Sequence, residues 1–271
     1  MTTSQARTES ARPREARHET SRAELLGRLA SGEFGALRVI VMLVVIWAVF
    51  QVANDRFLSA INLTNLMLQI TAVGMISVGV ALVLLLGEID LSVAAVSGLA
   101  AGVVAVLNVK SGWPAPAAIA VGLAVGAAIG ALNGVFVTRL GLPSFGNAEA
   151  ARRAGIRVTR IRMVVFSLAS MLAAAGGILA ASRLLAVNQS SGGGDLLLLA
   201  IAGPVIAGVS LFGGRGSVWA ALLGAVVIGS ISNGMDLLAL ESSVKFMITG
   251  AVLLAAVSID AASRLRSQPT S

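Results

Sequence analysis

Two carboxylates lie close together in the stretch "GEIDLS", Gly87–Ser92, between two long apolar runs. Paired carboxylates in such a place could relay protons, because ionisable groups in membrane segments often mark ion or proton pathways. They could also mark a break between two helices, with Asp90 capping the N-terminus of the next helix. The second interpretation is favoured. Glu88, Asp90 and Ser92 are therefore candidates for a helix break or for the transport pathway.

The remaining residue types exclude several classes of chemistry. The chain has no cysteine, and its only histidine, His18, lies in a polar N-terminal stretch. Thiolate catalysis, a histidine triad and a sulfur-ligated metal are therefore excluded. The glycine-rich "LFGGRGS", Leu211–Ser217, lacks the Lys-Ser/Thr pair of a phosphate-binding loop. We predict no catalytic residue, no metal site, no cofactor and no ATP hydrolysis by this chain alone.

The composition is that of a membrane protein. Hydrophobic residues make up 56% of the 271 positions and charged residues only 12%, about half of the roughly 25% found in soluble domains. The apolar runs are continuous rather than alternating, which favours helices over a barrel. The net charge of +7 comes without an aromatic-basic module, so a nucleic-acid partner is not expected. The predicted fold class is an all-α, polytopic helical bundle.

Eight apolar segments are long enough, or nearly long enough, to cross a membrane as helices. They cover residues 37–53, 64–86, 91–109, 114–137, 161–182, 196–212, 217–237 and 244–260. Three regions follow from them: a polar cytoplasmic tail at 1–35, a transmembrane domain at 36–262 and a cytoplasmic C-terminal tail at 263–271.

The basic residues predict the orientation. With the N-terminus inside, sixteen of the 20 lysines and arginines fall on the inner side, and the outer side holds Arg56, Lys110, Arg183 and Lys245. This asymmetry follows the positive-inside rule and predicts that both termini are cytoplasmic. Asp236 and Glu241 join Lys245 at an outer turn, where a surface cluster is favoured over a contact with a partner.

Glycines recur at a regular spacing along the fourth predicted span. In the fourth span a glycine falls at every fourth position, at Gly122, Gly126, Gly130 and Gly134. Such a strip lets helix backbones approach closely in lipid. Packing within one bundle is favoured over a dimer face.

Two of the spans also share a short sequence pattern. "GAAIGALNG" (Gly126–Gly134) is echoed by "GAVVIGSISNG" (Gly224–Gly234), and each ends in Asn-Gly. Internal repeats are common in transporters. Asn133 and Asn233 are therefore further candidates for the pathway or for helix breaks.

A polar, arginine-rich segment interrupts the apolar sequence at residues 146–160. Asn147 is a suitable N-cap, "AEAARRA" contains strong helix formers and Gly155 is a natural stop. A helix of about two turns is expected, carrying Glu149, Arg152 and Arg153. An ordinary basic inner loop would need none of these signals, so a knob that docks into another protein is the preferred interpretation.

Several longer sequence motifs resemble those of the membrane permease of ribose/xylose-type sugar ABC importers. They are "LLLGEIDLSVAAVSGLAAG", "NGVFVTRLGLPSF", "GNAEAARRAGI", "SLFGGRGSVWAALLGAVVIGSISNGMDLL" and "SSVKFMITGAVLLAAV", in the family's order over most of residues 62–260. The Glu of "GEIDLS" resembles the xylose branch. In relatives, however, "GLPSF" leads into roughly two more spans, so this chain resembles a family member with an internal deletion after Phe145.

The resemblance implies a permease subunit that imports xylose or a similar pentose by alternating access across a bacterial inner membrane. It implies a homodimer, an ATP-binding subunit on the cytoplasmic side and a sugar-binding protein outside. The residues that would contact the ATP-binding subunit are Glu149, Ala150, Ala151, Arg152, Arg153 and Gly155.

Three alternatives remain open. The chain could be a truncated, non-transporting permease that inserts in the membrane and still binds the ATPase subunit. It could be a secondary transporter, although few carboxylates are available for a coupling-ion site. It could also be an ABC permease for branched-chain amino acids, although "GEIDLS" and "SLFGGRGS" favour a sugar.

Overall fold

The computed structural model describes residues 35–139, 153, 155 and 157–266, and every regular element in these ranges is a helix. In chain order the elements are α2 (Gly35–Ala53), α3 (Ala60–Leu85), α4 (Val93–Ala105), η1 (Val106–Lys110, a π-helical continuation of α4), α5 (Ala115–Arg139), α7 (Val158–Leu184), α8 (Gly194–Ile206), α9 (Val218–Leu237) and α10 (Ser242–Arg266).

Each of the eight predicted apolar segments corresponds to a helix in the described part of the chain. Five of these are long and apolar enough to cross a membrane by themselves: α3, α4 with η1, α5, α7 and α9. Three shorter apolar helices accompany them, at Val39–Ala53, Gly194–Ile206 and Ser242–Ser258. The protein is therefore an all-helical, multi-pass membrane protein.

The predicted span 196–212 needs a correction, because α8 ends at Ile206. Gly208, Gly213 and Gly214 have φ angles of 91°, 81° and 74°. These left-handed conformations, which glycine adopts at little cost, stop the helix. Residues 207–217 instead form a non-helical connection before α9, and the side chain of Ser217 caps that helix by accepting from the N–H of Ala220.

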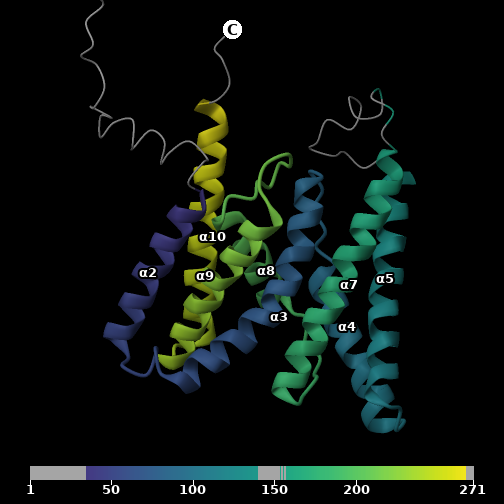
Figure 1. Cartoon of the computed structure of the whole chain (residues 1–271), viewed down its shortest axis with the longest axis horizontal. Coiled ribbons are helices and arrows are strands. Elements are labelled where there is room, and N and C mark those ends of the chain that lie inside the picture. Colours follow the sequence, from purple (N-terminus) through teal and green to yellow (C-terminus); the bar gives the residue numbers. More distant parts are fainter. Residues whose placement is uncertain (1–34, 140–152, 154, 156, 267–271) are drawn as a thin grey trace, which may run out of the picture. The chain divides into compact units, whose positions relative to one another are not determined.

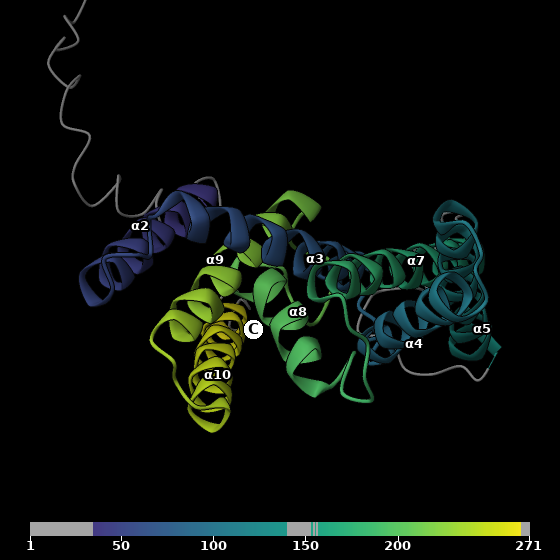
Figure 2. The same ribbon diagram turned by 90° about the horizontal axis from the view of Figure 1, so that it is seen from below.

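α3 lies between two groups of helices in the bundle (Figures 1 and 2). On one side it packs against α7, which in turn packs along α4 and α5. On the other side it packs against α8 and α9, and α10 packs against α8. The end of the bundle where α5 ends at Arg139 and α7 begins at Val158 is called the basic end below; in Figure 1 it is at the top.

The glycine strip of α5 faces α7 of the same chain. A Cβ added to Gly130 would lie 2.7 Å from the Cα of Ser167, and one added to Gly134 would lie 2.9 Å from the Cα of Met163. Gly126 likewise faces Ser170 of α7, and Gly122 lies against Val104 of α4. The absence of side chains lets the α5 and α7 backbones meet, as close packing in lipid requires.

α2 is attached to α9 by aromatic and polar contacts. The indole N–H of Trp47 donates to the hydroxyl of Ser230 at 2.9 Å. The Phe50 ring packs against Gly234 and stacks on Phe57, with ring centroids 5.4 Å apart.

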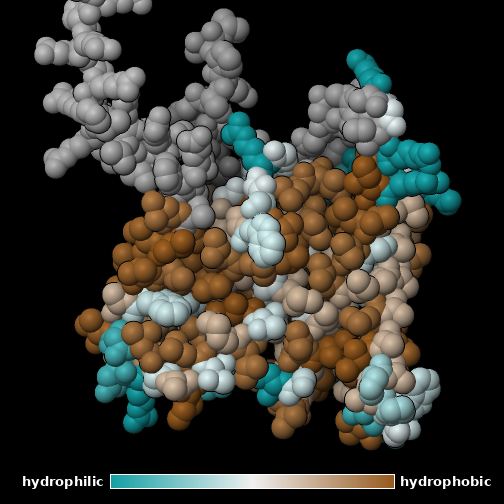
Figure 3. Space-filling model, viewed as in Figure 1, coloured by the Kyte–Doolittle hydropathy of each residue, from teal (hydrophilic) through white to brown (hydrophobic). Residues whose placement is uncertain are grey.

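The surface agrees with a membrane environment. Apolar side chains cover most of the visible face, and hydrophilic residues gather toward its two ends (Figure 3). Large apolar residues that would be unusual on a soluble surface are exposed here, including Val44, Val52, Leu132 and Val164. In a membrane these side chains would contact apolar lipid chains instead of water.

Candidate functional site at the basic end

The break between α3 and α4 begins with a tight stop at Gly87. The N–H of Gly87 donates to the carbonyl of Leu84, and the N–H of Glu88 donates to the carbonyl of Val83. Gly87 has a φ of 73°, a conformation that commonly ends helices because glycine has no Cβ to clash. The stop places Glu88 at the basic end, directed into the protein.

Glu88 pairs with Arg162 of α7. Their side chains meet at 2.7 Å between Oε1 and Nη2, and the two residues are only 5% and 6% exposed. The contact is a close charge pair rather than an aligned hydrogen bond, because Oε1 has no hydrogen-bond partner in the described part of the chain. Burial raises the pKa of the Glu88 carboxyl above its ordinary value, and the Arg162 guanidinium opposes that shift.

A second polar group joins the start of α4 to α5. Asp90 Oδ1 accepts from both the backbone N–H of Ser92, at 2.9 Å, and the Ser92 hydroxyl, at 2.6 Å. The Ser92 oxygen in turn accepts from the Asn133 side-chain amide at 2.8 Å. The structure thus brings three of the sequence-predicted candidates into one chain of hydrogen bonds.

The expected capping role of Asp90 needs a correction. The N-cap residue of α4 is Ser92, whose side chain makes no capping hydrogen bond. Asp90 instead orders the turn before the helix, because its carboxylate reaches the N–H two residues ahead, as Asp does in tight turns.

The "SLFGGRGS" connection packs against the same break. Gly214 N–H donates to the carbonyl of Leu85 at 3.2 Å, and a Cβ added to Gly213 would lie 2.5 Å from the Cα of Gly87. The glycines therefore allow two backbones to approach. In this structure they form a packing turn between the end of α3 and the start of α9.

Asn233 lies away from this site. It is near the end of α9 at the opposite end of the bundle, where its Oδ1 accepts from the side-chain amide of Asn62 at 2.8 Å. The same Asn62 amide group also donates to the carbonyl of Phe57. Asn133 and Asn233 thus hold the starts of two different helices, α4 and α3.

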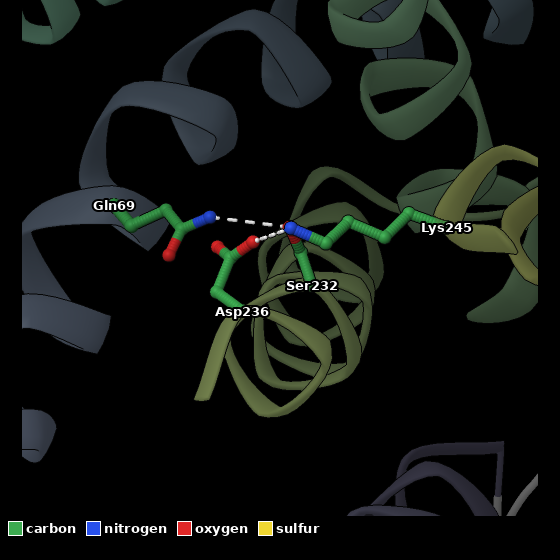
Figure 4. A network of polar contacts seen from close by, with 4 residues as sticks. All are labelled: Gln69, Ser232, Asp236 and Lys245. Atoms are coloured by element: carbon green, nitrogen blue, oxygen red, sulfur yellow. Dashed lines mark hydrogen bonds and ion pairs between the residues drawn. The ribbon is translucent and has the colours of Figure 1, made fainter. Parts of the chain in front are cut away.

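A further polar cluster joins α3, α9 and α10 toward the opposite end (Figure 4). Gln69 Nε2 donates to the Ser232 hydroxyl at 3.3 Å, and Lys245 pairs with Asp236. The side chains of Lys245 and Asp236 are 27% and 49% exposed. An ion pair this accessible contributes little to stability.

The predicted coupling residues lie mostly outside the described residues, namely Glu149, Ala150, Ala151 and Arg152. Arg153 is described as helical and exposed. Gly155 has a φ of 77°, the left-handed conformation in which glycine follows a helix end. The role of this segment stays a prediction.

Sequence reasoning missed Arg162, Asn62 and Gln69. Arg162 is one of the sixteen basic residues assigned to the inner side, but a charged residue just inside the predicted span 161–182 is itself a signal of function. In the described part of the chain, no three carboxylate, histidine or cysteine side chains lie close enough to hold a metal ion.

The helices and their buried polar contacts define a polytopic membrane protein whose transmembrane helices are joined by polar groups at both ends of the bundle. The chain belongs to the family described as "Branched-chain amino acid transport system / permease component", whose sequence profile matches residues 62–148 and 144–257.

Three relatives carry more specific descriptions. The ribose import permease protein of Bacillus subtilis is 30% identical over 303 aligned positions, which cover 84% of this chain and 92% of the relative. The xylose transport system permease protein of Escherichia coli K12 is 34% identical over 61% of this chain, but only 42% of that relative is covered. The fructose import permease protein of Rhizobium meliloti is 24% identical over 90% of this chain and 89% of the relative. No solved structure matches the chain.

The alignments also bear on the internal deletion. The alignment with the ribose permease has 303 positions and that with the fructose permease has 323, more than the 271 residues of this chain. Each relative therefore contains residues without a counterpart here. The two profile segments meet at residues 144–148, where the sequence predicts that family sequence is missing after Phe145.

Proposed function

We propose that this chain is the membrane permease subunit of an ATP-driven importer for a monosaccharide, with xylose or a similar pentose as substrate. The observation that carries the proposal is the similarity to a ribose import permease over 84% of the chain. The xylose and fructose permeases agree with a sugar substrate. Among the sugars, xylose is favoured because the Glu88 of "GEIDLS" resembles the residue of the xylose branch of the family.

The proposed function implies a transport mechanism by alternating access. An ATP-binding subunit docks at the basic end through residues 146–160, and its closure on ATP moves the adjoining helices between inward- and outward-facing arrangements. A sugar-binding protein delivers the substrate at the opposite end. Two copies of the chain enclose the pathway in the bacterial inner membrane, with both termini cytoplasmic. This chain transmits the motion, and the partner subunit hydrolyses ATP.

The test is uptake of radiolabelled xylose by cells that contain this chain with its ATPase and binding protein. We expect uptake that disappears when the ATPase is inactive. We also expect unlabelled xylose to reduce the uptake of the label more strongly than unlabelled ribose or fructose does. Better competition by ribose would assign ribose rather than xylose as the pentose, and better competition by fructose would contradict a pentose substrate. Uptake that follows an ion gradient and ignores ATP depletion would contradict the importer mechanism.

A second candidate function is supported by the gap in the alignments. Two missing spans would leave packing faces without partners, and an open apolar groove of about 360 Å³ does lie along α5 and α7, lined by Ala127, Met163, Val164, Ser167, Leu168 and Met171. The chain would then insert and bind the ATPase without transporting sugar. Uptake by a version restored to family length, but not by this chain at equal membrane levels, would favour this candidate.

A further inference from the structure

Arg162 differs from the other described arginines near the start of α7. Arg157 and Arg160 are exposed, whereas Arg162 is only 6% exposed and its guanidinium meets Glu88. Arg162 lies just over one helical turn after the start of α7 at Val158. Its charge is therefore directed away from the basic surface and into the contact between α7 and the α3–α4 break.

The pair has no obvious value for stability alone. Removing two charges from water is costly, and well-packed apolar residues of similar size often stabilise a protein as well or better. A buried pair does fix how two elements lie relative to each other. Here it fixes the first turns of α7 against the segment Gly87–Ser92.

That segment is attached to three other elements. Two residues after Glu88, Asp90 holds Ser92, which accepts from Asn133 of α5. On the other side, Gly87 touches Gly213 in the connection that leads to α9. A displacement of the Glu88 end would therefore be transmitted to α4, α5 and the start of α9 through contacts already in place.

α7 can carry such a displacement as a rigid element. Its backbone packs on the glycine strip of α5 at Gly126, Gly130 and Gly134, and on α4 and α3 through Gly177 and Gly176. At the basic end α7 meets the end of α3 through Phe166, which packs with Val83, and it meets Glu88 in the α3–α4 break through the charge pair with Arg162.

We infer that the Arg162–Glu88 pair links the coupling segment to the transport helices: motion imposed on the start of α7 by the ATP-binding subunit reaches the α3–α4 break through this pair. Both are positioning residues and neither needs to touch the sugar. The inference rests on the proposed function, because it requires a partner that moves the start of α7 when ATP binds.

The experiment uses the full complex of permease, ATPase and binding protein in liposomes, with sugar uptake and ATP hydrolysis measured together. The variants are R162Q and E88M/R162M, and the matched control is R139Q, which removes an exposed arginine at the same end of the bundle. In the double variant two apolar side chains replace the pair, so the fold is retained while the ionic link is lost.

A second readout reports on the break itself. Because the chain has no cysteine, Ile89→Cys introduces a single thiol at an exposed position of the break, 48% accessible. Its rate of labelling with a maleimide is measured with and without a non-hydrolysable ATP analogue. We expect the analogue to change this rate in the otherwise unchanged chain and in R139Q, but not in R162Q or E88M/R162M.

For uptake per ATP hydrolysed, we expect a loss on the order of tenfold in both pair variants, within the usual range of couplings between distant sites. R139Q should behave as the unchanged chain. If E88M/R162M transports and responds to nucleotide like R139Q, the inference is overturned and the proposed function stands. If the unchanged chain shows neither ATP-dependent uptake nor a nucleotide effect, the proposed function is overturned and the inference with it.

Discussion

The side-chain amide of Asn133 donates a hydrogen bond of 2.8 Å to the hydroxyl of Ser92. This bond connects the C-terminal part of α5 to the residue that directly precedes α4. The same hydroxyl donates to Asp90 at 2.6 Å, so one serine connects two helices and a turn. All three residues are partly buried, and within this group each hydrogen bond is made to another member.

Replacing Asn133 by leucine should weaken the α4–α5 junction. The expected loss in free energy of unfolding is about 0.6 kcal/mol and at most about 1.7 kcal/mol, as for polar contacts between membrane helices. Unfolding in mixed detergent micelles with increasing SDS measures it. N65L is the control, because Asn65 is exposed on α3 and has no described partner. Equal effects of the two substitutions would contradict a role for the Ser92 contact.

The two ion pairs should differ in their contribution to stability. Arg162→Ala leaves the buried Glu88 charge without compensation, so we expect a loss of about 3–5 kcal/mol in the free energy of unfolding. Lys245→Ala breaks an exposed pair with Asp236 and should cost about 1 kcal/mol or less. The same detergent titration compares them, and a loss for R162A no larger than that for K245A would disprove the burial argument.

A methyl group on the glycine strip should separate α5 from α7. Gly130→Ala would place its Cβ 2.7 Å from the Cα of Ser167 and 2.8 Å from the carbonyl carbon of Phe166, so one helix must shift. Overpacking of this kind costs about 1–3 kcal/mol. Gly102→Ala is the control, since nothing lies within 4 Å of the added Cβ. The melting temperature of the purified protein should fall in G130A and stay unchanged in G102A.

The proposed orientation predicts the side from which single thiols can be labelled. Ser111, in the turn between η1 and α5, and Arg215, in the connection before α9, are both exposed. With the N-terminus inside, a membrane-impermeant maleimide added to intact cells should label Ser111→Cys and leave Arg215→Cys unlabelled until the cells are opened. The reverse pattern would contradict the positive-inside assignment.

Charge reversal in the coupling segment should release the ATP-binding subunit. For R152E/R153E we expect co-purification of the ATPase with the membrane protein to fall, because a surface that fits a basic segment would meet the opposite charge. Arg139→Glu makes a like change at the end of α5, outside the segment. Undiminished co-purification of the double variant would contradict the coupling role of residues 146–160.

The number and approximate positions of the apolar helices in the described ranges could be predicted from sequence because the length of an apolar run is a local property. The breaks at Gly87 and Gly155 could also be expected, since glycine allows the left-handed conformation that both residues adopt. The helix α8 ends at Ile206, several residues before the end of the predicted span 196–212. The sequence continues apolar to Phe212, but Gly208 takes a left-handed φ of 91° soon after the helix ends, and contacts of Gly213 and Gly214 with the end of α3 hold the non-helical path that follows.

A repeated Asn-Gly in the sequence points to Asn133 and Asn233, but not to their hydrogen-bond partners. Ser92 lies 41 residues from Asn133 and Asn62 lies 171 residues from Asn233, and no local pattern encodes such a pairing. The charge of Arg162 and its place after the basic segment are determined by the sequence alone. Its burial was decided by the tertiary structure, because only the packing of α7 against the α3–α4 break excludes water around Arg162 and brings Glu88 to its guanidinium.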